Sequence, residues 1–142
     1  MRIVIVGAGK TGAFLGAKLT EDNDVTLIEI RSARVEKVRQ MLSSARVIDG
    51  DACEPAILEK AGISGADLLV AATGDDEDNL VVAMLAREYK VKRVVGRVNH
   101  PANEWLFDKE WGVDQALSGP GALWHLVQGQ CEAAAVQTEL PD

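Results

Sequence analysis

Short apolar runs alternate along this chain with amphipathic stretches, and this alternation predicts the fold. Five runs of three to five residues are rich in β-branched side chains, and a weaker sixth run follows them. We expect the five runs to be apolar on both faces, as strands buried inside a parallel sheet are. The predicted strands cover residues 3–6, 25–28, 46–48, 68–71, 94–98 and 113–117.

The stretches between these runs repeat apolar residues three, four or seven positions apart, which is the spacing of one helix face. Turn residues such as those of 49–51 and 74–76 separate the elements. Strands that alternate with helices over short links predict an α/β fold of right-handed βαβ units. We expect a Rossmann-type, doubly wound parallel sheet of about six strands in the order 3-2-1-4-5-6. The predicted helix stripes contain Leu15, Leu19, Val35, Val38, Leu42, Ile57, Leu58, Ala61, Val81, Met84 and Leu85.

The last segment of the chain differs from the rest. After Pro120 and Gly121 comes a helical stripe beside a tryptophan. We predict a nucleotide-binding domain over residues 1–120 and a C-terminal helix and tail over 121–142. The helix either packs across the edge of its own sheet or crosses to a partner subunit. Its stripe consists of Leu123, Val127, Cys131 and Ala134, next to Trp124.

The amino-acid composition restricts the expected partners and the cellular location of the chain. The chain of 142 residues has 22 Asp and Glu against 15 Lys and Arg, a formal net charge of −7, and no basic block. Because phosphate backbones are bound by clustered Lys and Arg, nucleic acid is not expected as a partner. The two cysteines, Cys53 and Cys131, form neither a disulfide framework nor a metal-ligand cluster, so a reducing cytoplasm is the default location.

The first predicted turn, GAGKTG at residues 7–12, matches two phosphate-binding signatures. A P-loop ending at Lys10 would need its first glycine at position 4, where Val4 lies inside the strand, so that signature is rejected. The Rossmann pattern fits. Gly7 permits the tight turn, Gly9 lets the backbone approach a pyrophosphate, and Gly12 lets the helix press against the strand.

An acid ends the second predicted strand, as a Rossmann site requires. Glu29 lies 17 residues after Gly12, close to the expected spacing of about 20. Its carboxylate can accept hydrogen bonds from both ribose hydroxyls of an adenosine and would repel a 2′-phosphate, although Arg31 weakens that exclusion. Lys10 either reaches a terminal phosphate or faces the solvent.

Three further groups of polar or aromatic residues have competing interpretations. The acids at 75–78 are expected to cap a helix rather than to bind a metal ion, because neighbouring helical side chains point apart. Arg97 closes the fifth strand, where it pairs with a carboxylate or reaches a phosphate. We expect Trp105 and Trp111 to pack around the segment before the sixth strand. No catalytic arrangement is expected.

Many short motifs fall in an order that resembles a known family. They are Gly50-Asp51-Ala52, Leu58, Ala61-Gly62-Ile63, Ala66-Asp67, Thr73, Asp76-Glu77, Asn79, Arg97, Leu106-Phe107 and Gly112-Val113-Asp114. Over residues 2 to about 120 the chain is similar to the RCK domain, also called KTN or TrkA-N, of potassium-transport regulators.

This resemblance implies a regulatory module rather than an enzyme. It would bind NAD(H), ATP or ADP and control a membrane potassium transporter or channel subunit from the cytoplasm, at the inner face of the membrane. It would form dimers that assemble into rings. The family usually adds a smaller C-terminal domain or a tandem repeat, so we expect either a fragment or a single-domain member. The alternative function is the cofactor-binding half of an NAD-dependent oxidoreductase.

The candidate nucleotide-binding residues combine the glycine motif with the resemblance. The resemblance implies that Asp51 and Ala52 flank the adenine and that Thr73 and Gly74 line the far end of the crevice. The full set is Gly7, Ala8, Gly9, Lys10, Thr11, Gly12, Glu29, Ile30, Arg31, Asp51, Ala52, Cys53, Thr73, Gly74 and Arg97.

Overall fold

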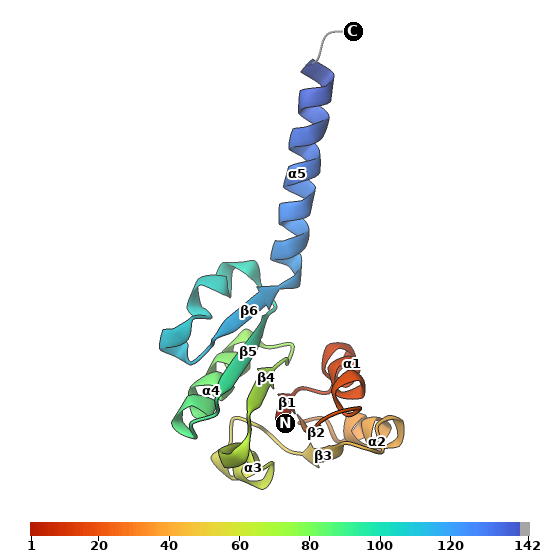
Figure 1. The fold of residues 1–142 in the computed structure, drawn as a ribbon, viewed down its shortest axis with the longest axis vertical. Coiled ribbons are helices and arrows are strands. Elements are labelled where there is room, and N and C mark those ends of the chain that lie inside the picture. The colour runs from red at the N-terminus through yellow and green to blue at the C-terminus, as the bar shows by residue number, and fades with distance from the viewer. Residues whose placement is uncertain (140–142) are drawn as a thin grey trace.

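A six-stranded parallel sheet forms the centre of the computed structural model, which describes residues 1–139 (Figure 1). The strand order is β3-β2-β1-β4-β5-β6, with every neighbouring pair parallel. This confirms the predicted doubly wound sheet and its order. The strands are β1 (Arg2–Val6), β2 (Asp24–Glu29), β3 (Arg46–Asp49), β4 (Leu68–Ala71), β5 (Arg93–Val98) and β6 (Gln115–Ser118).

Helices cover the two faces of the sheet and give the domain two apolar cores. Helices α1 (Lys10–Leu19) and α2 (Ser32–Met41) pack over β1, β2 and β3, and α3 (Pro55–Lys60) and α4 (Asp76–Glu88) pack on the opposite face (Figure 1). Short 3₁₀ helices η1 (Ile63–Gly65), η2 (Pro101–Leu106) and η3 (Lys109–Trp111) complete the second layer. Fully buried side chains of both cores include Ile5, Leu27, Val35, Leu58, Leu69 and Val82.

Helix α4 buries a different face from the one predicted. Val81 and Met84 are exposed, at 40% and 46% of their surface, whereas Leu80 and Ala83 are buried. The buried stripe begins with two polar residues, Asp76 and Asn79. Apolar spacing alone therefore selected the wrong face, because the side chains that turn inward at the start of this helix carry polar groups.

The edge of the sheet at β5 and β6 is covered on one face only. Burial alternates along β5, and Val95 and Arg97 are exposed, so the prediction of a strand apolar on both faces is wrong here. Strand β6 begins at Gln115 rather than at Val113, because Val113 belongs to the buried core beside Phe107. Within the described residues no helix covers this outer face.

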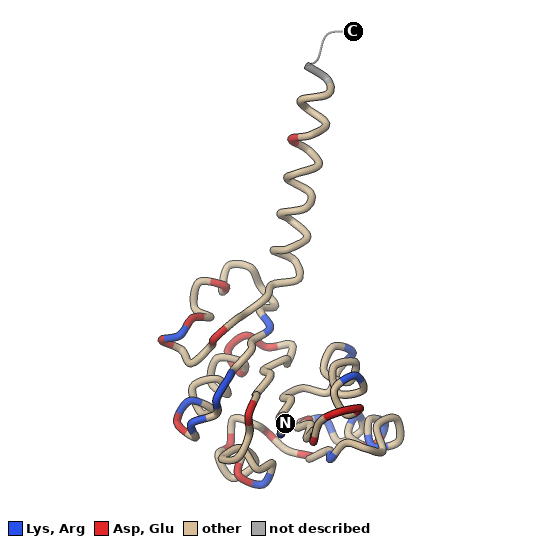
Figure 2. The backbone as a smooth tube through the Cα atoms, viewed as in Figure 1, with Lys and Arg blue, Asp and Glu red and all other residues tan. Residues whose placement is uncertain are grey.

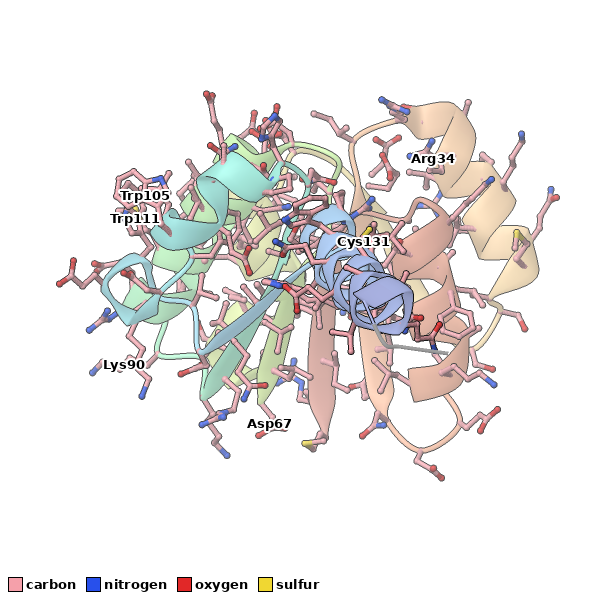
Figure 3. All side chains as sticks on the ribbon, turned by 90° about the horizontal axis from the view of Figure 1, so that it is seen from above. Arg34, Asp67, Lys90, Trp105, Trp111 and Cys131 are labelled. Carbon is pink, nitrogen blue, oxygen red and sulfur yellow. The ribbon has the colours of Figure 1, made fainter. Side chains whose placement is uncertain are left out.

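The prediction that the two tryptophans pack against the segment before β6 is wrong for both residues. Trp105 leaves 76% of its surface exposed, and Trp111 leaves 36%. Both lie at the outer edge of the domain (Figure 3). The 3₁₀ helices that carry them present their aromatic side chains outward, so packing around this segment relies instead on Phe107, which is buried.

The trailing helix α5 (Gly119–Glu139) extends away from the domain (Figure 1). Leu123, Trp124 and Leu126 are 58% to 69% exposed, so the helix does not pack across the edge of its own sheet. Charged residues are concentrated on the domain and nearly absent from the described part of this helix (Figure 2), and its sequence contains only Glu132 and Glu139 as Asp, Glu, Lys or Arg. None of the helices in the described part of the chain meets the length and hydropathy that a membrane span needs. The end of the predicted tail, 140–142, lies outside the described residues.

Candidate functional site

A cleft of about 430 Å³ opens at the carboxyl ends of the central strands. It lies where the chain leaves β1 for one face and β4 for the other, the switch point at which open α/β sheets bind ligands. Loops after β1, β2, β3 and β4 form its walls, and Arg97 of β5 closes one side. The predicted residues that line it are Gly7, Gly9, Glu29, Ile30, Arg31, Asp51, Ala52, Cys53, Thr73, Gly74 and Arg97.

Four predicted residues do not line this cleft. Lys10 and Thr11 are exposed in the first turn of α1, and Ala8 and Gly12 are buried. Ala8 contributes its backbone N–H to the site, whereas Gly12 contributes to packing. A direct role for Lys10 with a terminal phosphate stays a prediction.

The glycine loop has the geometry that its sequence predicts. Gly7 adopts a φ of +99°, and a Cβ atom there would lie 2.8 Å from the carbonyl oxygen of Ala72. A Cβ atom on Gly12 would lie 1.7 Å from the carbonyl oxygen of Gly7, so α1 can approach the end of β1 only without a side chain at this position. The N-terminus of α1 is thereby placed at the cleft.

The carboxylate of Glu29 is fixed at the floor of the cleft. Only 5% of its surface is exposed. Oε1 accepts a hydrogen bond from the backbone N–H of Ala8 at 2.9 Å, and Oε2 accepts one from the N–H of Arg31 at 2.9 Å. Each oxygen keeps a second lone pair. The carboxylate is therefore held rigidly and can still accept hydrogen bonds from hydroxyl groups.

The structure adds residues that the sequence did not single out for this site. Arg34, in the first turn of α2, approaches Glu29 with 3.6 Å between Nη1 and Oε1. Asp75 and Asp78, at the start of α4, also line the cleft. Asp75 and Asp78 belong to the acidic run at residues 75–78. No sequence spacing predicts that Arg34 lies near the glycine loop, because the position of Arg34 depends on the direction in which α2 leaves the sheet.

The acidic end of the cleft supports the capping interpretation of residues 75–78. Oδ1 of Asp75 accepts a hydrogen bond from the N–H of Asp78 at 3.0 Å, which caps α4. Burial and the nearby Asp75 raise the pKa of Asp78 above its usual range. Among the described residues no group of three or more His, Cys, Asp or Glu side chains is arranged to hold a metal ion.

Cys53 lies among these acids as a protonated thiol. Burial, followed by the charges of Asp78 and Asp51, raises the pKa of Cys53 to about 12. The thiol donates to Oδ1 of Asp78 over 3.7 Å. Because the thiolate is the nucleophilic form, this side chain is a weak donor in the wall of the cleft and not a reactive group at neutral pH.

A buried asparagine ties together the strand ends beneath the cleft. The Oδ1 atom of Asn79 accepts hydrogen bonds from the N–H and hydroxyl of Thr73, at 3.0 and 2.6 Å. Its Nδ2 donates to the carbonyl oxygens of Thr73 and Arg97, at 3.1 and 3.0 Å. Asn79 is completely buried, so these bonds fix the ends of β4 and β5 relative to each other.

Asp76 extends this network to the loop after β5. Its carboxylate accepts hydrogen bonds from the N–H groups of Asn99 and His100 and from the side chains of Asn99 and Asn103. Burial alone would raise the pKa of Asp76, but the bonds from Asn103, Asn99 and His100 outweigh burial and lower it. The carboxylate is therefore a structural anchor.

The strand order, the glycine turn and the buried acid define a Rossmann-type nucleotide-binding domain. The sequence matches the TrkA-N domain over residues 3–119, and the chain belongs to that family. It is 42% identical over 130 residues to the Trk system potassium uptake protein TrkA of Mycobacterium tuberculosis, a match that covers 90% of this chain and 58% of the relative. It is 41% identical over 119 residues to a TrkA homolog of Methanothermobacter thermautotrophicus, covering 83% of this chain and 54% of the relative.

Solved structures share the fold at low sequence identity. The TrkA-N domain of the inner membrane protein ybaL from Escherichia coli aligns with a TM-score of 0.79 at 22% identity, covering 91% of this chain and 95% of that one. The Shewanella denitrificans Kef CTD in AMP-bound form gives 0.72 at 21%, with 96% and 82% covered. The GsuK channel bound to NAD gives 0.71 at 17%, with 82% and 21% covered. The chain spans somewhat more than half the length of the TrkA proteins from M. tuberculosis and M. thermautotrophicus.

Proposed function

We propose that this chain is a regulatory domain that binds an adenine nucleotide and thereby controls a membrane potassium transporter or channel. The observation that carries the proposal is the carboxylate of Glu29, held by two backbone N–H groups beside a glycine turn at the switch point of the sheet. This arrangement suits the two ribose hydroxyls of an adenosine. The Kef structure is in an AMP-bound form and the GsuK channel is bound to NAD, which supports the same class of ligand here.

The two ends of the cleft suggest how the ligand is placed. Asp51 and Ala52 lie after β3 and would flank the adenine, while the N-terminus of α1 would face the phosphates. Thr73 and Gly74 would line the far end, next to Asp75, while Asp78 also lines the cleft and contacts Cys53. Because these two acids repel negative charge, the number and position of the phosphates would decide how well NAD(H), ADP and ATP are accepted.

Nucleotide binding would act as a signal rather than as the start of a reaction. The thiol in the cleft is protonated, and the side chain of Asn79 beneath the cleft is occupied in hydrogen bonds with Thr73 and Arg97. For regulation, the ligand must bind two arrangements of the domain with different affinity. The curated relatives are potassium uptake proteins, which supports a potassium transporter or channel as the membrane partner. The domain would act at the cytoplasmic face of that partner.

We also propose that residues 121–142 act as a separate part that pairs with a second copy of the chain. Helix α5 exposes Leu123, Trp124 and Val127, and the uncovered face of the sheet exposes Val95 and Leu117. Exposed apolar surfaces of this kind usually mark an interface. The helix of one copy covering the β5–β6 face of the other would bury both surfaces, and such dimers could assemble further into a ring.

Calorimetry on nucleotide-free protein, with ATP, ADP, NAD and NADH in parallel, tests the binding proposal. At least one should bind, and Gly9→Asp should abolish that binding, because it places a carboxylate where phosphates approach. A Cβ atom on Gly9 meets only Nη1 of Arg34, at 3.4 Å, so this variant should fold. If none of the four nucleotides binds to the folded wild-type protein, the proposed function is wrong.

Sedimentation over a range of concentrations tests the pairing. Trp124→Glu should convert a dimer into a monomer, whereas Gln130→Glu, which adds the same charge further along α5, should do so less. A wild-type chain that sediments as a monomer at high concentration would contradict this part of the proposal.

A further inference from the structure

Arg34 lies between the carboxylate expected to hold the ribose and the glycine loop expected to face the phosphates. Its Nη1 lies 3.6 Å from Oε1 of Glu29, the carboxylate expected to hold the ribose. The same Nη1 atom lies 3.4 Å from the point where a Cβ atom of Gly9 would be. Gly9 is the glycine whose bare backbone is expected to meet the phosphates. In the structure, a guanidinium therefore fills the space that ribose and phosphate would share.

The lone pairs of Glu29 show why this matters. One lone pair of Oε1 accepts from Ala8 and one of Oε2 accepts from Arg31. Nη1 of Arg34 lies beside Oε1 without a hydrogen bond to it. A ribose hydroxyl that approaches Oε1 therefore competes with the guanidinium for the space and the charge of this oxygen.

The ion pair between Arg34 and Glu29 is weak enough for Arg34 to exchange Glu29 for another partner. A separation of 3.6 Å is an ion pair and too long for a good hydrogen bond. The Arg34 side chain is 39% exposed, so water screens the pair and the guanidinium can move at low cost. Arg34 lies in the first turn of α2, at the carboxyl end of the strands and opposite Asp67 (Figure 3).

We propose that Arg34 is a specificity-determining residue that exchanges its ion pair with Glu29 for the 5′-phosphate when a nucleotide binds. This inference rests on the proposed nucleotide function. The guanidinium leaves Oε1 as the ribose arrives and makes a charge-assisted hydrogen bond to the phosphate nearest the ribose. Arg34 thus opposes a nucleoside, which offers no phosphate in return, and favours a nucleotide.

The proposal predicts effects of opposite sign for two ligands. In Arg34→Ala, adenosine should bind about two- to fourfold more tightly, because it no longer competes with an exposed ion pair. ADP should bind about tenfold more weakly or worse, because a charge-assisted hydrogen bond to its phosphate is lost. If Arg34 had only a structural role, Arg34→Ala would weaken the binding of adenosine and of ADP alike.

Calorimetry with adenosine, 5′-AMP, 2′-AMP and ADP tests this. Arg34→Ala is compared with wild-type protein, with Arg34→Gln, which keeps most of the length without the charge, and with Lys37→Ala. Lys37 is exposed on the same helix and outside the cleft, so Lys37→Ala removes one positive charge without touching the site and should leave the ratio of ADP to adenosine affinity unchanged.

The expected result is a fall of that ratio by about 30-fold in Arg34→Ala and a similar fall in Arg34→Gln. Equal changes for adenosine and ADP in both variants would overturn the proposal. A larger loss of affinity for 2′-AMP than for 5′-AMP would also overturn the proposal, because the guanidinium would then contact a phosphate on the 2′ side of the ribose instead of the 5′-phosphate. Wild-type protein that binds neither these four ligands nor ATP, NAD or NADH would instead refute the proposed function itself.

Discussion

Replacing Asn79 with alanine should destabilise the domain strongly, because this side chain is completely buried and makes four hydrogen bonds. The hydroxyl of Thr73 keeps a bond to Asp75 O, and the carbonyl of Thr73 keeps one from Asn99. The N–H of Thr73 loses its partner, and the carbonyl of Arg97 loses one. A buried donor without a partner costs about 1–3 kcal/mol, and the second lost bond adds about 1 kcal/mol. The expected loss in the free energy of unfolding is about 2–4 kcal/mol.

Urea denaturation followed by circular dichroism measures this loss. With a slope of about 1–3 kcal/mol per molar urea, the midpoint for Asn79→Ala should fall by about 1–2 M while the slope stays unchanged. Asn103→Ala is the matched control, because Asn103 donates a single bond to Asp76, whose carboxylate keeps its other partners. That control should lose about 1 kcal/mol. A midpoint for Asn79→Ala no lower than for Asn103→Ala would refute the role assigned to the buried network.

Three further predictions concern other parts of the domain. Gly12→Ala should prevent stable folding or cost about 3 kcal/mol or more, since its Cβ atom would lie 1.7 Å from the Gly7 carbonyl; a thermal melt close to wild type would contradict this. Lys10→Ala should weaken ATP more than AMP in calorimetry, and equal losses would exclude a terminal-phosphate contact. The lowered pKa of Asp76 stabilises the fold at pH values above its unfolded pKa, near 4, and that stability is lost as the pH falls through the folded pKa. Urea midpoints from about pH 6 to 3 should therefore fall less steeply in Asp76→Asn than in wild type.

The sheet and the glycine turn could be predicted because each depends on local sequence. β-branched runs mark the strands, and the position of Glu29 follows from its distance to the glycine motif. The same local patterns fail where polar side chains turn inward. The buried face of α4 contains Asp76 and Asn79, which hydropathy assigns to the surface. Only the order of short motifs drew attention to them.

Contacts between elements lay beyond the sequence. Arg34 reaches Glu29 because of the path that α2 takes across the sheet, and no spacing rule fixes this path. The exposed face of β5 could not be predicted either, because a run such as Val94 and Val95 reads the same whether one or both faces are covered. In the structure, α5 of the same chain extends away from that face.

Helix α5 also has a mechanical consequence. Its 21 residues give a length of about 30 Å, and its contacts with the domain are concentrated at its base, where the hydroxyl of Ser118 accepts a hydrogen bond from the N–H of Gly121. A rod held only at one end magnifies rotation. A tilt of about 10° at Ser118 displaces the far end of a helix of this length by about 5 Å, nearly one helical turn. Small rotations at β6 therefore produce displacements of several ångströms, about 5 Å for a tilt of about 10°, at the far end of the helix.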